Sequence, residues 1–326
     1  MNFLSHAFRR SALFAACILA APATVLAQKY PDKPIRLIVP FAAAGTTSIL
    51  ARFVAQHLSP LYGQQIIVEN KPGAGGHLGA EFVARAAPDG YTLLLGTIGI
   101  HAAHALYPSL PYDPARELQP VIILVDLPLA LVVNPSFAGK SVQDFLAMAK
   151  ARPGDLNFSS AGAGSSTHMT GELFQLMSGV KLTHIPYKGS APAMQDVMGG
   201  QVHAMFEQLP TILPQIEGGR LRALGVTSKA RAPQLPQVPT IAESGVPGYE
   251  STAWFTVAAP AKVPAAIIQK LNADLVAMLS NPEIQARLRE QGMNAVGGSS
   301  DFASRYYVSE TEKWTRVIKT GNLKAE

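Results

Sequence analysis

The chain has 326 residues, of which 48% are hydrophobic and 15% charged, with 27 basic against 22 acidic residues and a net charge of +5. This weak charge is spread along the chain rather than clustered, which argues against a nucleic-acid-binding surface. The length exceeds the roughly 100–150 residues of a typical single domain, so two lobes are expected.

Residues 1–27 have the pattern of a removable export signal. Arg9 and Arg10 form a basic start, residues 12–21 an apolar run, and residues 25–27 a small-residue cleavage site. The apolar run ends at Pro22 and is shorter than the roughly 20 residues of a spanning helix, which disfavours a retained anchor. A lipoprotein signal at Cys17 and twin-arginine export both match poorly. The general secretory route is favoured, and the mature protein is expected to begin near Gln28.

Cysteine use and hydropathy agree with a periplasmic location. Cys17 is the only cysteine and lies within the predicted signal, so the mature chain needs no disulfide in an oxidising compartment. Without Arg9 and Arg10, 25 basic residues remain against 22 acidic ones. The longest later apolar run, residues 120–133, is interrupted by Asp126 and Pro128, so the mature protein is expected to be soluble.

Along the mature chain, short β-rich runs alternate with amphipathic segments. Strands are predicted over residues 35–39, 65–69, 91–96, 121–125, 129–134, 156–159, 181–185, 203–206, 221–227 and 255–259. Helices are predicted over residues 49–58, 142–150, 168–177, 191–198, 211–217, 265–279, 283–290 and 302–319. This alternation predicts an α/β fold with parallel sheets covered on both sides and ligands at the carboxyl ends of the strands. The proline-rich residues 232–249 are expected to form a long surface connection.

Two distant segments share one design, in which a strand, a small-residue turn and hydroxyl residues open a helix. The first runs from the strand at 35–39 to Thr46-Thr47-Ser48, and the second from the strand at 156–159 to Ser165-Ser166-Thr167. A helix start leaves backbone N–H groups unpaired and carries a partial positive charge, so an uncrowded one binds carboxylate or phosphate. Neither segment has an acidic residue near the helix start. The pair predicts two anion sockets, one per lobe, although helix caps and tight turns alone would give a similar pattern.

Other segments of the chain match known nucleotide-binding and metal-binding motifs poorly. The glycine-rich residues 73–79 lack the spacing of a dinucleotide loop and are interpreted as a turn with close packing, while residues 139–141 lack the earlier glycine of a phosphate loop. His101 and His104 have no neighbouring cysteine or carboxylate, so neither a metal site nor a cofactor is expected.

Hydrolase chemistry finds little support in the motifs. No G-x-S-x-G sequence surrounds Ser165 or Ser166. His168 stands three residues after Ser165 and could in principle activate a hydroxyl. Its expected role is a polar wall or a helix-end hydrogen bond.

Ordered motifs cover essentially the whole mature chain. They are YPDKPIR at 30–36, VPF at 39–41, ENKPGAGG at 69–76, APDGYTL at 87–93, LPYDP at 110–114, SAGAGSSTH at 160–168, PYKG at 186–189, GGQV at 199–202, VPTIAESG at 238–245 and WF at 254–255. In these motifs the chain resembles the Bug-type extracytoplasmic receptors, the substrate-binding subunits of tripartite tricarboxylate transporters.

The resemblance implies a periplasmic-binding-protein type II fold, with two doubly wound α/β lobes joined by two crossover segments and a ligand cleft between them. Lobe 1 is then expected over residues 28–126 and 254–326, and lobe 2 over residues 127–253. The implied function is capture of a small carboxylate by hinge closure, without catalysis, and delivery to membrane subunits of a transporter. The receptor is expected to act as a monomer.

In that family, the loop after the first strand and a glycine- and serine-rich loop of the second lobe hold a carboxylate. The resemblance implies that residues of these two loops bind the ligand together with Thr97 of the first lobe, His168, and a wall of the second lobe formed by Tyr187, Gly189 and Glu207. The expected ligand-binding residues are Ala43, Ala44, Gly45, Thr46, Thr47, Thr97, Ala161, Gly162, Gly164, Ser165, Ser166, His168, Tyr187, Gly189 and Glu207. Glu207 stands where family members usually carry Asp. For Tyr187 the alternative is core packing, and for Glu207 a solvated loop position.

This chain departs from the family in the first loop. Ala43, Ala44 and Ser48 replace a proline, a glycine and an aspartate, which leaves ligand selectivity open among dicarboxylates, citrate-like acids, aromatic acids, acidic amino acids and nicotinate-like ligands. The loss of a carboxylate at Ser48 is expected to make that helix start more receptive to anions. Two other functions remain: a receptor that signals to a membrane sensor kinase, and a secreted serine hydrolase.

Overall fold

The computed structural model describes residues 30–324. The predicted signal at 1–27 lies outside the described residues. Contacts divide the chain into Met1–Asp32 and a compact unit, Lys33–Glu326, which holds all the regular structure discussed below. Within the described range, every helix is too short or too polar to cross a membrane.

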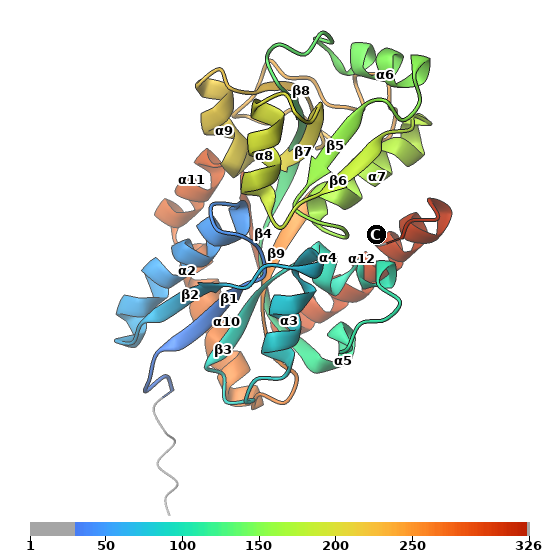
Figure 1. Ribbon diagram of the computed structural model, residues 1–326. Coiled ribbons are helices and arrows are strands. Elements are labelled where there is room, and N and C mark those ends of the chain that lie inside the picture. Colours follow the sequence, from blue (N-terminus) through green and yellow to red (C-terminus); the bar gives the residue numbers. More distant parts are fainter. Residues whose placement is uncertain (1–29, 325–326) are drawn as a thin grey trace, which may run out of the picture. The chain divides into compact units, whose positions relative to one another are not determined.

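Ten strands alternate with helices along this unit (Figure 1). The strands are β1 (Ile35–Val39), β2 (Ile66–Asn70), β3 (Thr92–Thr97), β4 (Leu118–Val133), β5 (Asn157–Ser160), β6 (Thr183–Pro186), β7 (Ala204–Gln208), β8 (Arg222–Val226), β9 (Thr252–Pro260) and β10 (Asn294–Gly297). The helices are α2 (Thr46–Tyr62), α3 (His77–Ala84), α4 (Ile98–His101), α5 (Pro114–Glu117), α6 (Val142–Ala151), α7 (Ser166–Ser178), α8 (Ser190–Met198), α9 (Leu209–Glu217), α10 (Ala265–Ser280), α11 (Pro282–Glu290) and α12 (Ser300–Thr320). Two short 3₁₀ turns, η1 (Ala74–Gly76) and η2 (His104–Leu106), complete the set.

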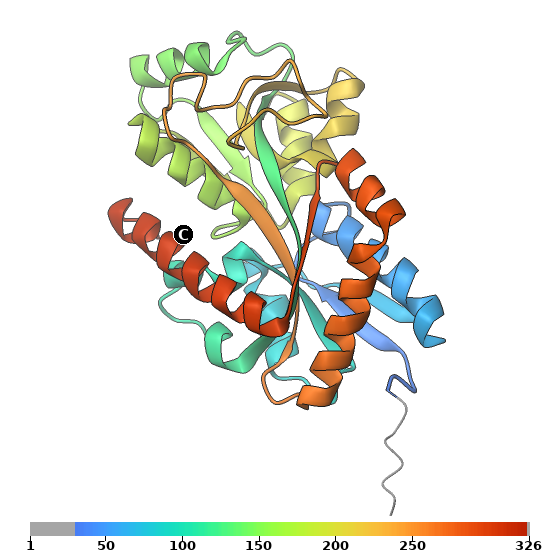
Figure 2. The same cartoon turned by 180° about the vertical axis from the view of Figure 1, so that it is seen from behind.

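The strands form one sheet in the order β2-β1-β3-β9-β4-β7-β5-β6, with β10 and β8 also paired to β4. Strand β4 pairs with β9 and β10 along its first part and with β7 and β8 from Leu129 onward. The sheet is thereby divided into two lobes (Figures 1 and 2). We call the β1–β3 and β10 part, with α2–α5 and α10–α12, lobe 1, and the β5–β8 part, with α6–α9, lobe 2.

The alternation of side chains along the strands explains how both faces of the sheet are covered in each lobe. In lobe 1, Ile35 and Leu37 of β1 face α2 and α10, whereas Ile38 packs with Ala80 and Val83 of α3. In lobe 2, Ala130 and Val132 of β4 pack with α8 and α9. The opposite side of the lobe 2 sheet is filled by aromatic rings from α6, α7 and the strands, namely Phe145, Phe158, Phe174 and Phe206.

The two-lobed α/β fold is confirmed, but the strictly parallel sheets are not. The pairs β1–β2, β1–β3, β5–β6 and β5–β7 are parallel, whereas β4 and β9 run antiparallel to their neighbours. These two strands carry the chain between the lobes, so their direction differs from that of the strand-helix repeats. The predicted boundaries at 126/127 and 253/254 fall inside β4 and β9, and they stay a prediction.

The two strands predicted at 121–125 and 129–134 are one continuous strand. A proline normally disfavours an inner strand because it has no N–H to donate. Pro128 lies where β4 exchanges its partner β9 for β7 and β8, and Leu129 N–H donates to Thr227 Oγ1 (2.8 Å) directly after it. The strand therefore continues through the proline.

Two other expectations were partly wrong. Residues 73–79 were predicted as a turn, but α3 already begins at His77. The proline-rich connection lacks helices and strands, yet Ile241, Val246 and Tyr249 are buried within it. Tyr249 Oη donates to the Thr170 carbonyl (2.9 Å), which ties this segment to α7.

Candidate functional site

A small cavity lies between the two lobes, at the ends of several strands. Its volume is about 20 Å³, and its lining contains hydroxyl, amide, small and aromatic groups but no charged side chain. The lining residues are Phe41, Gly45, Thr46, Thr47, Thr97, Ala161, Ser165, Ser166, Ser190, Gln208 and Phe255. The two loops singled out in the sequence therefore face one common space.

Five helices begin at this cavity. Gly45, Thr97, Ser165 and Gln208 are the N-cap residues of α2, α4, α7 and α9, and Ser190 is the first residue of α8. The N-terminal end of a helix carries a partial positive charge and N–H groups without intrahelical partners. With no acidic side chain in the lining, the cavity favours an anion.

The start of α2 is the more open of the two predicted sockets. No side chain caps this helix, and its first turn has no acidic residue. The first backbone bonds here run from Ser48 and Ile49 N–H to the Gly45 carbonyl, so the amides of Thr46 and Thr47 precede them. Thr46 Oγ1 is buried without a hydrogen-bond partner among the described residues. This end can therefore donate several hydrogen bonds to a ligand.

The structure shows where Ala43, Ala44 and Ser48 of the first loop lie. Ala44 has a left-handed backbone (φ 68°), a conformation that glycine adopts with less strain than alanine. Ser48 does not line the cavity, because its Oγ accepts a hydrogen bond from Asn70 Nδ2 (2.9 Å) of β2. Ala43 and Ala44 also lie outside the cavity wall.

In the second loop, most backbone N–H groups donate hydrogen bonds to side chains of the same segment. The helix cap is present, since Ser165 Oγ accepts from His168 N–H (3.3 Å). Three further amides donate to side chains, Ala161 to Thr167 Oγ1 (2.8 Å), Gly162 to Ser160 Oγ (3.1 Å) and Gly164 to His168 Nδ1 (3.0 Å). The start of α7 is therefore held in place by side chains of its own loop, and it has fewer free N–H donors than the start of α2.

His168 lies behind this wall and does not line the cavity. Its Nδ1 accepts from the Gly164 amide, its Nε2 lies 3.4 Å from Glu172 Oε1, and its ring stacks on His184 at 4.0 Å. Of the two expected roles, the geometry supports the helix-end hydrogen bond. Because Nδ1 faces a backbone amide and not Ser165 Oγ, the ring is not placed as a base for that hydroxyl.

The Tyr187–Gly189 turn contacts lobe 1 instead of the cavity. The Lys188 carbonyl accepts from Ala42 N–H (3.2 Å), and a Cβ at Gly189 (φ 153°) would lie 2.9 Å from Ala42 Cβ. The Tyr187 hydroxyl donates to the Asp196 carboxylate, and burial, together with Asp196, raises the pKa of Tyr187 to about 12. Tyr187 is half-buried against the hydrophobic core of lobe 2, as the packing alternative expects.

Glu207 is fully buried, so the solvated-loop alternative is wrong for it. Its Oε1 accepts from Gln208 N–H (2.9 Å) and Thr211 Oγ1 (3.2 Å), while Oε2 has no partner among the described residues. Burial raises the pKa of Glu207 to about 7, and the polar groups of the nearby Ser190, Gln208 and Thr211 offset part of that effect. Glu207 thus supports Ser190 and Gln208 of the wall without lining the cavity itself.

The lobes touch around the cavity. Tyr107 Oη of lobe 1 donates to the Ala163 carbonyl of lobe 2 (2.6 Å), and a Cβ at Gly99 would lie 2.5 Å from the Gly164 carbonyl oxygen. A cavity of about 20 Å³ holds about one water molecule. An organic carboxylate is larger than this space, so the lobes must part for it to enter and must close around it less tightly than they do here.

Sequence reasoning missed four residues of the wall, which are Phe41, Ser190, Gln208 and Phe255. Of the predicted residues, Gly45, Thr46, Thr47, Thr97, Ala161, Ser165 and Ser166 line the cavity, whereas Gly162 and Gly164 brace it from the second loop. Ser190 had a signal in the sequence, because it follows a strand and Gly189 and opens a helix, as the two sockets do.

The chain is similar to known proteins over most of its length. A family model described as "Tripartite tricarboxylate transporter family receptor" matches residues 50–323. Protein BugT of Bordetella pertussis is 39% identical over 94% of this chain and 94% of its own length. The solved structure "R. palustris Rpa4515 with adipate" is 41% identical over 90% of this chain and 99% of that one (TM-score 0.88). MatC from Rhodopseudomonas palustris with bound malate is 33% identical over 89% and 100% (TM-score 0.84).

Proposed function

The chain belongs to the family of tripartite tricarboxylate transporter receptors, and from that premise we propose that it captures a small dicarboxylate between its lobes and delivers it to transporter membrane subunits. Proteins of this family are periplasmic solute-binding receptors and not enzymes.

One observation carries the proposal. Five helix starts point at a single cavity whose lining has neutral donors and no charged side chain. Partial charges of this kind stabilise a carboxylate by electrostatic attraction and direct N–H hydrogen bonds. The relatives with adipate and malate carry dicarboxylates, which makes this class the first to test here.

Lobe closure supplies the coupling between binding and delivery. A carboxylate held at α2 of lobe 1 reaches Ser165, Ser166 and Ser190 of lobe 2 only when the lobes meet. The ligand therefore binds the closed form more tightly and shifts the hinge equilibrium towards it. A closed receptor presents both lobe surfaces together to the membrane subunits.

Calorimetry on residues 28–326 with adipate, malate and a wider carboxylate set tests the ligand. We expect a saturable isotherm with one site for at least one dicarboxylate and none for uncharged analogues. If no carboxylate binds to a folded preparation, the proposed function fails.

Gly99→Ala tests whether closure matters. Gly99 has no positive φ, so alanine suits its backbone, but its Cβ would lie 2.5 Å from the Gly164 carbonyl of the opposite lobe. We expect at least a tenfold loss of affinity, equivalent to about 1.4 kcal/mol, without loss of folding. Gly199→Ala is the matched control, because Gly199 is exposed and its Cβ would meet only atoms within a few residues along the chain, of which the Gln195 carbonyl oxygen is nearest at 3.3 Å. Equal affinities for the two variants would contradict the closure step.

Delivery is tested in cells. Deleting the gene should abolish uptake of the ligand found by calorimetry, and uptake should return with the wild-type chain but not with Gly99→Ala. Unchanged uptake in the deletion strain, with loss of a transcriptional response instead, would favour the signalling receptor.

A further inference from the structure

One carboxyl group lies directly behind the wall of the cleft cavity. Glu207 of β7 is fully buried, and its neighbours Gln208 and Ser190 both line the cavity. Its Oε1 accepts hydrogen bonds from Gln208 N–H and Thr211 Oγ1, whereas Oε2 has no partner among the described residues. A buried carboxylate oxygen without a donor is destabilised in its charged form, because it has lost its hydration and gained no hydrogen bond. A proton on Oε2 removes this charge.

Within residues 30–324, no ionised partner offsets the charge of Glu207, because the side-chain and backbone groups that shift its pKa are all neutral. Glu207 pairs with Ala130 of β4 and shares the sheet face that packs against α8 and α9. The charged groups of these helices, of β8 and of the loop before α8 are either exposed or bonded elsewhere, and they are Asp196, Glu217, Arg222 and Lys188. His168 and His184 pack against Phe158, on the opposite face of the sheet.

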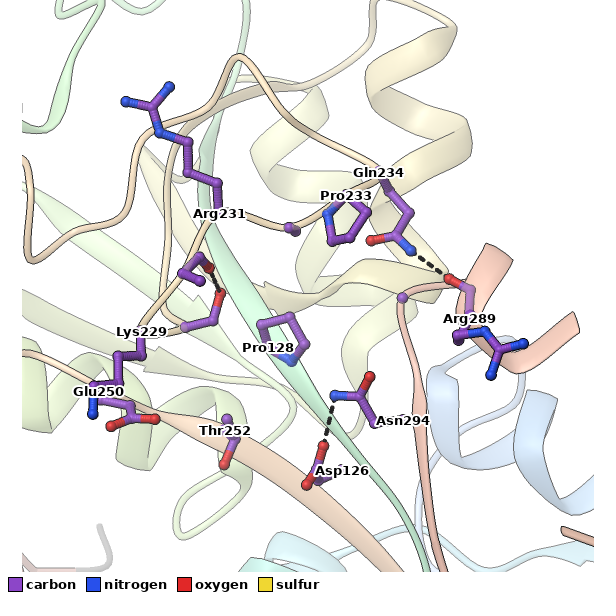
Figure 3. A pocket seen from close by; sticks show the side chains of 14 residues that line it. Asp126, Pro128, Lys229, Arg231, Pro233, Gln234, Glu250, Thr252, Arg289 and Asn294 are labelled. Atoms are coloured by element: carbon purple, nitrogen blue, oxygen red, sulfur yellow. Dashed lines mark hydrogen bonds between the residues drawn. The ribbon is translucent and has the colours of Figure 1, made fainter. Parts of the chain in front are cut away.

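Other carboxylates near the junction of the lobes differ from Glu207 in their access to solvent. Asp126, further along β4, and Glu250 line a pocket of about 490 Å³ that also contains Lys229 (Figure 3). Glu250 is exposed, and Asp126 is half-buried and accepts a hydrogen bond from Asn294 Nδ2 (2.9 Å). Water can therefore stabilise the ionised form of both groups, whereas Glu207 is closed off from it.

A bound carboxylate brings a second negative charge to the same place. The cavity lining contains no charged side chain, so helix starts and neutral donors alone hold the ligand. Two of these helices begin next to Glu207, because α8 starts at Ser190 and α9 is capped by Gln208. Their starts would then face two anions at once, the ligand and Glu207. Like charges close together in a buried site disfavour each other's ionised form, so ligand binding makes Glu207 hold a proton more tightly.

We propose that Glu207 is a positioning residue of the cleft site and that it takes up a proton when a ligand carboxylate binds. The proton comes from the solvent and attaches to Oε2, so the closed complex carries one negative charge fewer. Ser190 and Gln208 then meet the ligand with a neutral group behind them. The receptor accordingly binds its ligand more tightly in acid than in alkali, and the coupling is reciprocal. The inference rests on the proposed function, because it concerns the same cleft.

Calorimetry on residues 28–326 with adipate, or with malate if adipate does not bind, counts the proton directly. Because burial raises the pKa of Glu207 to about 7, the free receptor is about half protonated at pH 7, and binding should take up roughly half a proton per ligand. The apparent enthalpy of binding at pH 7 should therefore differ between HEPES and Tris, whose ionisation enthalpies differ. The dissociation constant should rise by at least about fivefold from pH 6.5 to pH 8.5, the lower end of typical coupling between two sites.

Variants assign the proton to Glu207. Glu207→Gln keeps an acceptor of similar size that cannot ionise, so its affinity should be nearly constant over this pH range and its enthalpy independent of the buffer. Glu207→Asp keeps a carboxyl group and should retain a pH dependence. Glu217→Gln is the matched control, because it removes the same charge at the exposed end of α9 and should behave as the wild type. A pH dependence that survives Glu207→Gln would assign the proton to another group, such as His168, and would overturn the proposal.

The wild-type receptor decides the question even if Glu207→Gln does not fold. Binding with equal affinity at all three pH values and equal enthalpy in both buffers would exclude proton uptake and leave the proposed function intact. If neither adipate nor malate nor any other carboxylate binds to the folded receptor, the proposed function fails and the proton uptake fails with it.

Discussion

At the scale of single residues, Glu207 differs most from what its type suggests. A fully buried carboxylate with one unpartnered oxygen is costly in its charged form, because desolvation is not repaid by a counter-ion. Burial accordingly raises the pKa of Glu207 to about 7. The side chain is therefore close to half protonated at neutral pH, directly beneath two residues of the cavity wall.

Glu207→Gln should stabilise the protein in alkaline solution. Because the folded pKa of Glu207 is raised from 4.5 to about 7, its contribution is fully present below pH 4.5 and is lost as pH rises through 7. At pH 8 this loss is on the order of 3 kcal/mol. Glutamine keeps an acceptor for Gln208 N–H without the charge. Urea unfolding should give the variant a higher free energy of unfolding at pH 8 and a similar one at pH 5, and a lower value at pH 8 would refute the assignment.

At the scale of elements, the two socket loops have similar sequences but different hydrogen bonding. The loop before α7 uses its own serine, threonine and histidine side chains to occupy its amides. The start of α2 has no such cap. We therefore expect α2 to provide the stronger anion attraction and α7 to provide a fixed wall.

Thr46→Asp tests the role assigned to α2. A carboxylate there would lie at the cavity and repel a bound anion by about 4 kcal/mol at 4 Å with an effective dielectric constant near 20. We expect at least a 100-fold loss of carboxylate affinity in calorimetry. Thr46→Asn has nearly the same shape without the charge and should retain most of the binding. Similar losses in both variants would mean that shape, and not charge, sets the effect.

Strand β4 shows that a local sequence pattern can predict two strands where the structure has one. Pro128 and Asp126 predicted a break between two strands, and their local preferences support that view. The structure keeps one strand because the proline falls where the hydrogen-bonding partners change. The same exchange turns β4 into a connection between the lobes.

At the scale of the whole molecule, buried histidines of both lobes favour a neutral state. Burial lowers the pKa of His77 to about 4, of His101 to about 3 and of His184 to about 2, with smaller contributions from neighbouring histidines. His77 contacts Tyr112 Oη (2.8 Å), and His101 stacks against Tyr307 at 4.3 Å. Folding therefore disfavours protonation of these histidines in both lobes.

The protein should lose stability steeply in mild acid. Because these folded pKa values lie below the ordinary 6.5, the unfolded chain binds more protons, and stability falls as pH drops through 6.5. Near pH 5 these three histidines act in this direction together with His104, whose pKa burial also lowers, and Glu207 acts against them. At least about two protons remain, or roughly 3 kcal/mol per pH unit. Urea unfolding at pH 5, 6 and 7 measures this slope. A free energy of unfolding that stays constant over this range would contradict the buried, neutral histidines.

Much of the fold and part of the site were predictable from contiguous segments. The alternation of strands and helices predicted an α/β fold, and small residues before Thr46 and Ser165 predicted uncrowded helix starts. The ordered motifs indicated the family. These features are local, because helix starts, turns and alternation depend on neighbours within a few residues along the chain.

Only the tertiary structure decided which of these parts meet. Ser190, Gln208 and Phe255 come from three distant segments and reach the cavity through packing of strands and lobes. The burial of Glu207 and the contact of Tyr107 with Ala163 likewise depend on residues far apart in the chain. Local preferences cannot determine such distances, because they follow from how the crossing strands place one lobe against the other.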